Sequence, residues 1–166
     1  RNTPVEVVEA KYPLRVYKYG IHEGSCGPGK FRGGCGVERI IGPISHDSHC
    51  NVYHERHKCP PWGIMTGKAG FPNTNFIKKS SDSEEELVLK ARGFLIRSGG
   101  YVHVLTGGGG GFGDPFQRDP EKVRGDVIQD VISLNSALSD YGVSISQING
   151  QIDWENTSKF RREIKH

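Results

Sequence analysis

The residues whose type and spacing most suggest chemistry are a run of glycines from Gly107 to Gly111, between an expected strand and an expected helix. Backbone amides without side chains can cradle a phosphate, and a following helix would add a favourable dipole. The run lacks the Gly-Lys-Ser/Thr ending of a P-loop, and Asp114-Pro115 interrupts the dinucleotide pattern. We therefore favour a close-packed chain crossing, where side chains do not fit, over a phosphate site.

A second candidate is a segment rich in metal-ligating residue types, which are His46, His49, Cys50, His54, His57 and Cys59. Zinc accepts Cys and His in tetrahedral sets. If the segment from Cys50 to His54 is a strand, these two residues share one face, and His49 and Tyr53 take the other. Because no Cys-x-x-Cys pair occurs, we expect no bound metal, and a stand-alone zinc-binding module is kept as an alternative function.

The cysteines form two pairs with the same spacing of nine positions, and they are Cys26, Cys35, Cys50 and Cys59. The absence of a visible signal peptide and the room for a hydrophobic core favour reduced thiols in a cytoplasm over a secreted disulfide framework. Cys26 and Cys35 lie in a glycine-rich loop near Lys30 and Arg32, and neighbouring cations favour the reactive thiolate. With no partner histidine placed by the sequence, buried inert thiols are favoured over nucleophilic catalysis.

The elements that must position these residues begin with a β-rich part. Apolar alternation or β-branched content predicts strands over 14–19, 37–41, 48–56, 76–79 and 101–105, with a short helix or strand over 5–9. In the last strand, Tyr101, His103 and Leu105 would face one side, and Val102 and Val104 the other.

In the last third of the chain the apolar pattern becomes helical. One amphipathic helix is predicted by the recurrence of Val123, Val127, Ile128, Val131 and Ile132 behind a Pro-Glu start. A second helix is expected over 133–141, ended by Gly142, and a third over 153–164 with Trp154 and Phe160 on its apolar side.

These patterns predict an α+β fold in a single domain, 1–166, with a β-rich body over 1–113, glycine-rich loops and a mainly helical tail over 114–166. The 23 glycines among 166 residues agree with many tight turns. A net charge of only +3, from dispersed basic residues, argues against nucleic acid and membrane surfaces as partners. Apolar runs are too short to span a bilayer, and we expect a cytoplasmic protein.

Three motifs recur together in one known family. The chain carries Gly27-Pro28-Gly29-Lys30-Phe31-Arg32-Gly33-Gly34-Cys35-Gly36, then Pro60-Pro61-Trp62-Gly63, then Gly107 to Pro115, and Asn2-Thr3-Pro4-Val5-Glu6 precedes all three. They resemble the Gly-x-Gly-x-Phe-Arg-Gly-Gly-x-Gly, Pro-Pro-Trp-Gly and Gly-Gly-Gly-Gly-Tyr-Gly-Asp-Pro segments of the hydantoinase B/oxoprolinase family. The family usually has Gly or an apolar residue at the positions of Cys26 and Cys35, so the resemblance implies no role for these thiols.

The resemblance implies that these motifs form the C-terminal part of a longer B-type subunit. In such enzymes an A-type subunit binds ATP and phosphorylates the substrate carbonyl oxygen, and the B-type subunit completes hydrolysis or carboxylation. ATP, and a divalent metal where one is involved, would then belong to the full complex, with no cofactor bound by this chain. The implied partners are the N-terminal portion of the same subunit and the A-type subunit. A hydantoin, a lactam and a ketone all stay open as substrates.

Two roles within such an enzyme follow. The first is a structural or assembly domain that is not catalytic alone, in which Phe31, Arg32, Trp62 and Phe112 contact the rest of the enzyme. The second is a domain that lines the active site and contacts an anionic or phosphorylated intermediate. The candidate substrate or interface residues are Arg32, Arg39, Gly108, Gly109, Gly110 and Asp114, and the sequence assigns no catalytic residue.

Overall fold

The computed structural model describes residues 3–163, apart from the side chains of Ala91 and Glu163. Contacts group the chain into two compact units. The sheet unit comprises Arg1–Gly20, Val37–Lys58 and Asn73–Thr106, and the glycine unit comprises Ile21–Gly36, Cys59–Pro72 and Gly107–His166. The glycine-rich segments of the predicted β-rich body thus group with the helices. The predicted single domain stays a prediction.

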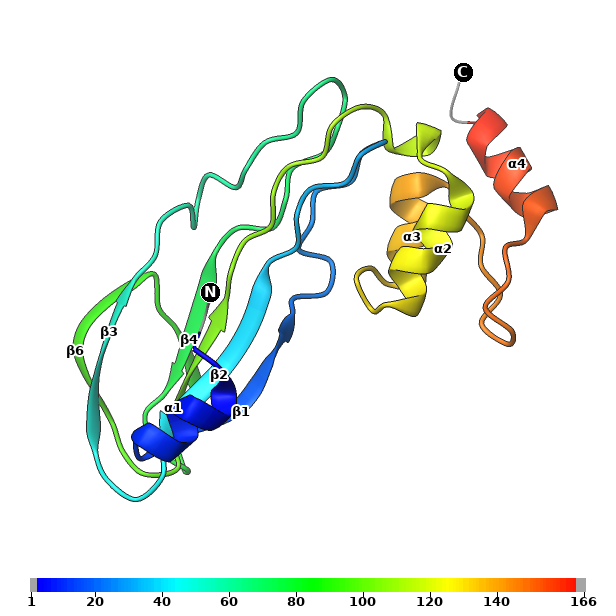
Figure 1. Ribbon diagram of the computed structural model, residues 1–166. Coiled ribbons are helices and arrows are strands. Elements are labelled where there is room, and N and C mark those ends of the chain that lie inside the picture. The colour runs from blue at the N-terminus through cyan, green and yellow to red at the C-terminus, as the bar shows by residue number, and fades with distance from the viewer. Residues whose placement is uncertain (1–2, 164–166) are drawn as a thin grey trace. The chain divides into compact units, whose positions relative to one another are not determined.

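Helices and antiparallel sheets both occur, so the predicted α+β class is confirmed (Figure 1). The elements in chain order are α1 (Val5–Lys11), β1 (Leu14–Ile21), β2 (Val37–Pro43), β3 (Ser48–Tyr53), β4 (Thr74–Lys78), β5 (Glu85–Leu87), β6 (Lys90–Ile96), β7 (Tyr101–Leu105), the 3-10 helix η1 (Pro115–Gln117), α2 (Pro120–Ile128), α3 (Leu134–Tyr141) and α4 (Trp154–Glu163). All five predicted strands are present, and the segment at 5–9 is helical.

The sheet unit is built from two sheets that share an apolar core. One sheet has the strand order β1-β2-β7-β4-β5, and the other pairs β3 with β6. Strands from both sheets contribute to the buried cluster, which contains Val52, Ile77, Val88, Ile96 and Val102. The alternation predicted for β7 is confirmed, because Val102 is buried and Val104 packs against this cluster.

The glycine unit has a core formed by its helices and the loops around them. Its buried residues are Cys26, Val123, Val131, Ile132, Ala137, Tyr141, Val143 and Ile152. The first predicted helix is shorter than expected: α2 ends at Ile128, and Asp130 adopts a left-handed backbone with φ of 53°. Val131 and Ile132 therefore reach the core from a turn and not from a helical face.

The second predicted helix is confirmed together with its boundaries. The Ser133 hydroxyl accepts a hydrogen bond from the Ser136 amide at the start of α3, and Gly142 ends the helix at φ of 62°. The third helix, α4, is also present, although Ile164 at its predicted end lies outside the described residues. Its predicted apolar side is wrong: Trp154 and Phe160 are exposed, and Thr157 is the buried residue.

Candidate functional site

Three glycine-rich segments of the glycine unit, 24–36, 61–71 and 107–113, lie side by side, and we call them the glycine bundle. Backbone hydrogen bonds join each segment to the others. The Gly27 amide donates to the Gly109 oxygen at 2.8 Å, and the Gly109 amide donates to the Gly34 oxygen at 2.9 Å. The Gly111 amide donates to the Lys68 oxygen at 2.9 Å. Two residues of the glycine run, Gly109 and Gly111, therefore use their amides within the bundle.

Glycine is required in the bundle because the backbones approach too closely for side chains. A Cβ added to Gly33 would overlap the carbonyl of Gly109, and one added to Gly108 would overlap the carbonyl of Ser25. A Cβ on Gly110 would overlap the carbonyl of Trp62 in the same way. The predicted close-packed crossing is confirmed. Neighbouring backbone therefore fills the space into which side chains would project from Gly33, Gly108 and Gly110.

Arg32 does not face an open site, because it belongs to a network of charges inside the glycine unit. Its Nε donates to Asp126 Oδ1 at 2.9 Å, and Arg118 Nη2 donates to Asp126 Oδ2 at 2.8 Å. The Asp126 side chain is only 8% exposed. Burial disfavours the charge on Arg32, but the hydrogen bond and charge of Asp126 outweigh it and raise the pKa of the guanidinium. This network joins the bundle to α2.

Asp114 also has a local structural role. Its carboxylate accepts a hydrogen bond from the Phe116 amide at 2.9 Å and so caps the 3-10 helix η1. Arg161 of α4 extends the structure around η1, because its Nη2 donates to the Arg118 oxygen at 2.8 Å and its Nε to the Tyr141 oxygen at 3.1 Å. The polar side chains here hold helices and loops together.

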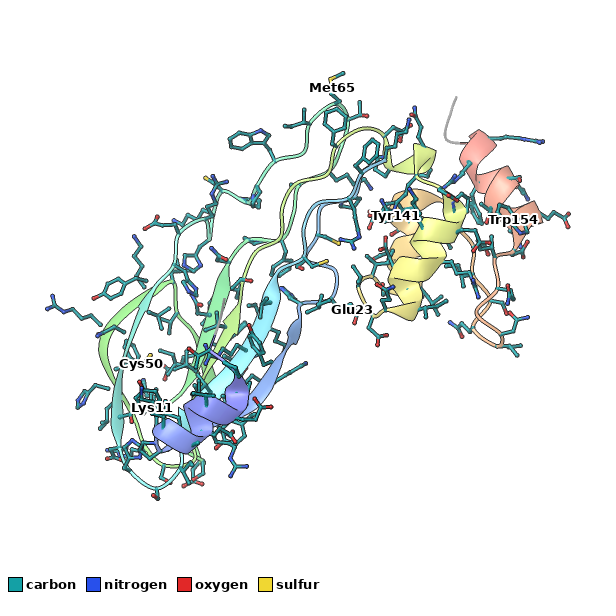
Figure 2. The ribbon with its side chains drawn as sticks, viewed as in Figure 1. Lys11, Glu23, Cys50, Met65, Tyr141 and Trp154 are labelled. Atoms are coloured by element: carbon teal, nitrogen blue, oxygen red, sulfur yellow. The ribbon has the colours of Figure 1, made fainter. Side chains whose placement is uncertain are left out.

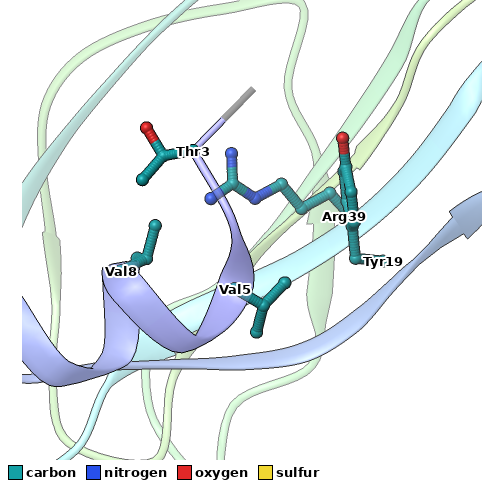
Figure 3. A pocket seen from close by; sticks show the side chains of 5 residues that line it. All are labelled: Thr3, Val5, Val8, Tyr19 and Arg39. Carbon is teal, nitrogen blue, oxygen red and sulfur yellow. The ribbon is translucent and has the colours of Figure 1, made fainter. Parts of the chain in front are cut away.

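Arg39 lies in the sheet unit, so the structure does not group it with Arg32. Figure 3 shows its guanidinium directed toward the start of α1, in a pocket of about 190 Å³ lined also by Thr3, Val5, Val8 and Tyr19. The guanidinium carbon lies 5.8 Å from the centre of the Tyr19 ring. Arg39 Nε is buried without a hydrogen-bond partner among the described residues. Arg39 is the member of the predicted set that combines a pocket with a spare donor.

The histidines of the His/Cys segment do not come together, because each makes a hydrogen bond to a different partner. His54 Nδ1 lies 2.8 Å from Asn75 Oδ1, and His57 Nδ1 lies 2.6 Å from the Asn73 oxygen. His46 Nε2 contacts the Ser48 hydroxyl at 2.8 Å. Within residues 3–163, no three His, Cys, Asp or Glu side chains are placed to hold a metal ion.

Five large apolar side chains are exposed at one end of the glycine bundle, and we call them the apolar tip: Phe31, Trp62, Ile64, Met65 and Phe112. Isolated β-bridges join Phe112 to both Phe31 and Ile64, and the Phe31 and Phe112 ring centres are 6.3 Å apart. Trp62 is 73% exposed and Met65 71%. Met65 marks this end of the loops in Figure 2.

The sequence indicated three members of the apolar tip through their motifs, but it missed Ile64 and Met65. Both lie in a short stretch between Gly63 and Gly67 that has neither helical nor strand periodicity. Only the bridge between Ile64 and Phe112 brings this stretch beside the other aromatic residues. Groups of exposed apolar side chains mark interaction surfaces in soluble proteins.

A charged cluster on the five-stranded sheet was also missed. His103 Nε2 lies 3.0 Å from Glu38 Oε1, and Lys18 Nζ lies 2.8 Å from Glu38 Oε2. Burial opposes ionisation of Glu38, but the hydrogen bonds and charges of Lys18 and His103 outweigh it and hold the pKa of this carboxyl below its usual value. β2 pairs with β7, and this pairing brings Glu38 to His103.

No helix within residues 3–163 is long and apolar enough to cross a membrane. The fold itself is shared with solved structures. The crystal structure of ATP-dependent caprolactamase from Pseudomonas jessenii matches with a TM-score of 0.81 and 27% identity, over 96% of this chain and 28% of that chain. A nucleotide-free acetone carboxylase structure matches with a TM-score of 0.82 and 24% identity, over 98% of this chain and 26% of that chain. At that identity the second likeness shows the fold alone.

Sequence comparison leads to one family. The B-type subunit of a putative D-/L-hydantoinase from Pseudomonas sp. (strain NS671) is 35% identical over 163 residues, which are 98% of this chain and 27% of the relative. This chain therefore spans little more than a quarter of the length of that relative. The family model for hydantoinase B/oxoprolinase matches residues 1–115. From these matches, which include the glycine bundle and the apolar tip, the chain belongs to the hydantoinase B/oxoprolinase family.

Proposed function

We propose that this chain is the C-terminal structural and assembly domain of a hydantoinase B-like subunit in an ATP-dependent cyclic-amide hydrolase or ketone carboxylase. Solved structures support the reaction class, since one is an ATP-dependent caprolactamase and the fold is shared with an acetone carboxylase. The chain corresponds to 27% of the hydantoinase subunit that it matches, so the activity would reside in the complete protein. As membership of the hydantoinase B/oxoprolinase family implies, ATP would bind to the A-type subunit.

The apolar tip is the observation that carries this proposal. Its side chains lie on a backbone that is fixed by the bundle, so little backbone conformational entropy would be lost when a partner covers them. Burying a large apolar side chain contributes on the order of 1.5–3 kcal/mol. Aromatic residues are enriched among the side chains that dominate binding energy at interfaces. The occupant that we propose is the N-terminal portion of the same B-type subunit.

The test uses the complete natural polypeptide and its A-type partner, with the double substitution Phe31→Ala and Trp62→Ala. Both side chains are mostly exposed here, so their truncation should leave the bundle intact. We expect faster proteolytic cleavage of the B-type subunit and a smaller assembled fraction by native mass spectrometry. If each side chain contributes about 2 kcal/mol to the interface and the effects add, losing both would weaken docking roughly 1,000-fold.

The matched control is Tyr53→Ala, which removes a side chain that is 64% exposed in the sheet unit. This variant should assemble normally and resist protease as the natural protein does. Turnover per assembled complex should also be unchanged in both proteins. Normal assembly and normal protease resistance of the double variant would contradict the proposal.

Arg39 supports a second candidate function, in which the domain lines the active site and contacts an anionic or phosphorylated intermediate. A guanidinium with a buried, unpartnered Nε in a small pocket suits a planar anion, because its donors form a fixed fork. Arg32 suits this role less well, since Asp126 already engages it. The substitution Arg39→Gln should then lower turnover while assembly survives. Unchanged turnover in the assembled variant would reject this function.

A further inference from the structure

Cys26 and Cys35 are brought together in the core of the glycine unit. Cys26 is 4% exposed and belongs to the buried cluster, and Cys35 packs against the same cluster while staying partly accessible. The Cys35 side chain is close enough to affect the ionisation of the Cys26 thiol, and all four cysteines of the chain are free thiols. Two thiols packed in the same cluster, one buried and one partly accessible to solvent, have the arrangement of a resolving and an attacking cysteine.

The surroundings of the pair favour reaction at Cys35. Arg32 Nη1 donates a hydrogen bond to Cys35 Sγ at 3.3 Å, and Asp126 holds the same guanidinium in place through Nε. This hydrogen bond fixes the position of the Cys35 sulfur, which belongs to the more accessible member of the pair. By contrast, burial and the neighbouring Cys35 raise the pKa of the Cys26 thiol to about 11. Cys26 is therefore suited to the second step, in which proximity compensates for its weak acidity.

We propose that Cys26 and Cys35 form a peroxide-sensitive oxidation site that closes to an intramolecular disulfide. The Cys35 thiolate attacks hydrogen peroxide, breaks the O–O bond and becomes a sulfenic acid, releasing hydroxide. The Cys26 sulfur then attacks the Cys35 sulfur, its proton and the departing hydroxyl leave as water, and the S–S bond forms. Overall, two thiols are oxidised by two electrons and one peroxide is reduced to two waters.

Neither of the other two cysteines has this arrangement. Cys59 is exposed, and Cys50 lies in the sheet unit, where it packs against the apolar core. Burial raises the pKa of the Cys50 thiol, which makes it a poor nucleophile. Cys59 is therefore the internal control for unselective surface oxidation, and Cys50 is the control for a thiol that peroxide should spare.

The test treats the reduced complete polypeptide with an equimolar amount of hydrogen peroxide, then alkylates the remaining thiols and digests the protein with trypsin. Lys18, Lys30, Arg32 and Arg39 place Cys26 and Cys35 in separate peptides, 19–30 and 33–39, so a disulfide links two fragments that are otherwise independent. We expect this linked pair to appear and Cys50 and Cys59 to be alkylated as free thiols. Two of the four thiols in this part of the protein would then be lost to oxidation.

Two variants separate the steps. In Cys26→Ser, Cys35 should still be oxidised, but its sulfenic acid should persist and be trapped by dimedone. In Cys35→Ser, Cys26 should remain a thiol, because it is buried and lacks its reactive neighbour. Oxidation of Cys59 before Cys35, or a Cys26 that stays alkylatable after Cys35 is oxidised in the natural protein, would overturn the proposal.

Discussion

The two units reach a packed interior in different ways. The sheet unit buries aliphatic side chains between two sheets, with Ile77 and Ile96 among the most buried. The glycine unit has an aliphatic cluster too, but its bundle is packed from backbone against backbone and is tied to α2 by Asp126 between two arginines. The stability of the sheet unit should therefore depend most on the volume of its buried side chains. The stability of the glycine unit should be lowered most by an added methyl group or by removal of a buried charge.

The largest effect is expected from Asp126→Ala, which leaves Arg32 and Arg118 partly buried without their counter-charge. Breaking a buried ion pair by removing one partner costs about 3–5 kcal/mol. We expect hydrogen exchange of the complete polypeptide to accelerate in α2, and the loss of stability to be concentrated in the glycine unit.

The control is Asp140→Ala, which removes the partner of the half-exposed Lys68 at 2.8 Å. Exposed pairs of this kind contribute about 1 kcal/mol or less. Equal effects of the two substitutions on hydrogen exchange would show that the buried network contributes no more to stability than an exposed ion pair.

In the sheet unit, Ile77→Ala should be the matching substitution. Ile77 is fully buried between the sheets, and truncation of a buried aliphatic residue to alanine costs about 2–5 kcal/mol. Exchange should rise in β4 and β7, which pair directly. The exposed Leu87 of β5 provides the control, since Leu87→Ala should change exchange little. Identical behaviour of the two variants would contradict an aliphatic core here.

Adjacent glycines offer the sharpest test of backbone packing. A Cβ at Gly33 would overlap the Gly109 carbonyl, whereas a Cβ at Gly34 would meet nothing within 4 Å. Overpacking typically costs about 1–3 kcal/mol, so Gly33→Ala should accelerate exchange across the bundle and Gly34→Ala should not. If both substitutions are tolerated equally, the close approach of the two segments is not needed for stability.

The smallest predicted effect is on the stability of the protein at acidic pH. Because the pKa of Glu38 is lower in the folded protein than its usual value of 4.5, its contribution to stability is complete above that value. It is lost as the pH falls through the lowered pKa. The substitution Glu38→Gln should remove this part of the acid sensitivity, about 1 kcal/mol or less, in urea unfolding measured from pH 6 to pH 3. An unchanged pH dependence would exclude Glu38 as its source.

Local patterns predicted much of the fold. The alternation in β7 and the Ser133 and Gly142 ends of α3 are properties of neighbouring residues, and both were correct. The end of α2 was missed because no residue before Asp130 indicates that its backbone is left-handed. Trp154 was misplaced because an apolar side chain was assumed to face inward.

The candidate site was harder to predict because its contacts join distant parts of the chain. No local pattern singles out Asp126, but its ion pair with Arg32, 94 positions away, makes it the centre of a network. The glycine crossing could be predicted from the absence of side chains. Its partner segments and the position of Ile64 beside Phe112 could not, because no local pattern encodes them.

The most direct test of the central claim is hydroxyl-radical footprinting of the apolar tip in the assembled enzyme. Trp62 and Met65 are highly reactive residue types, and both are exposed in this chain. If the tip docks against the rest of the subunit, both should oxidise several-fold more slowly than the exposed Tyr53, after correction for intrinsic reactivity. Trp62 and Met65 that oxidise freely in the assembled, active enzyme would contradict the assembly function.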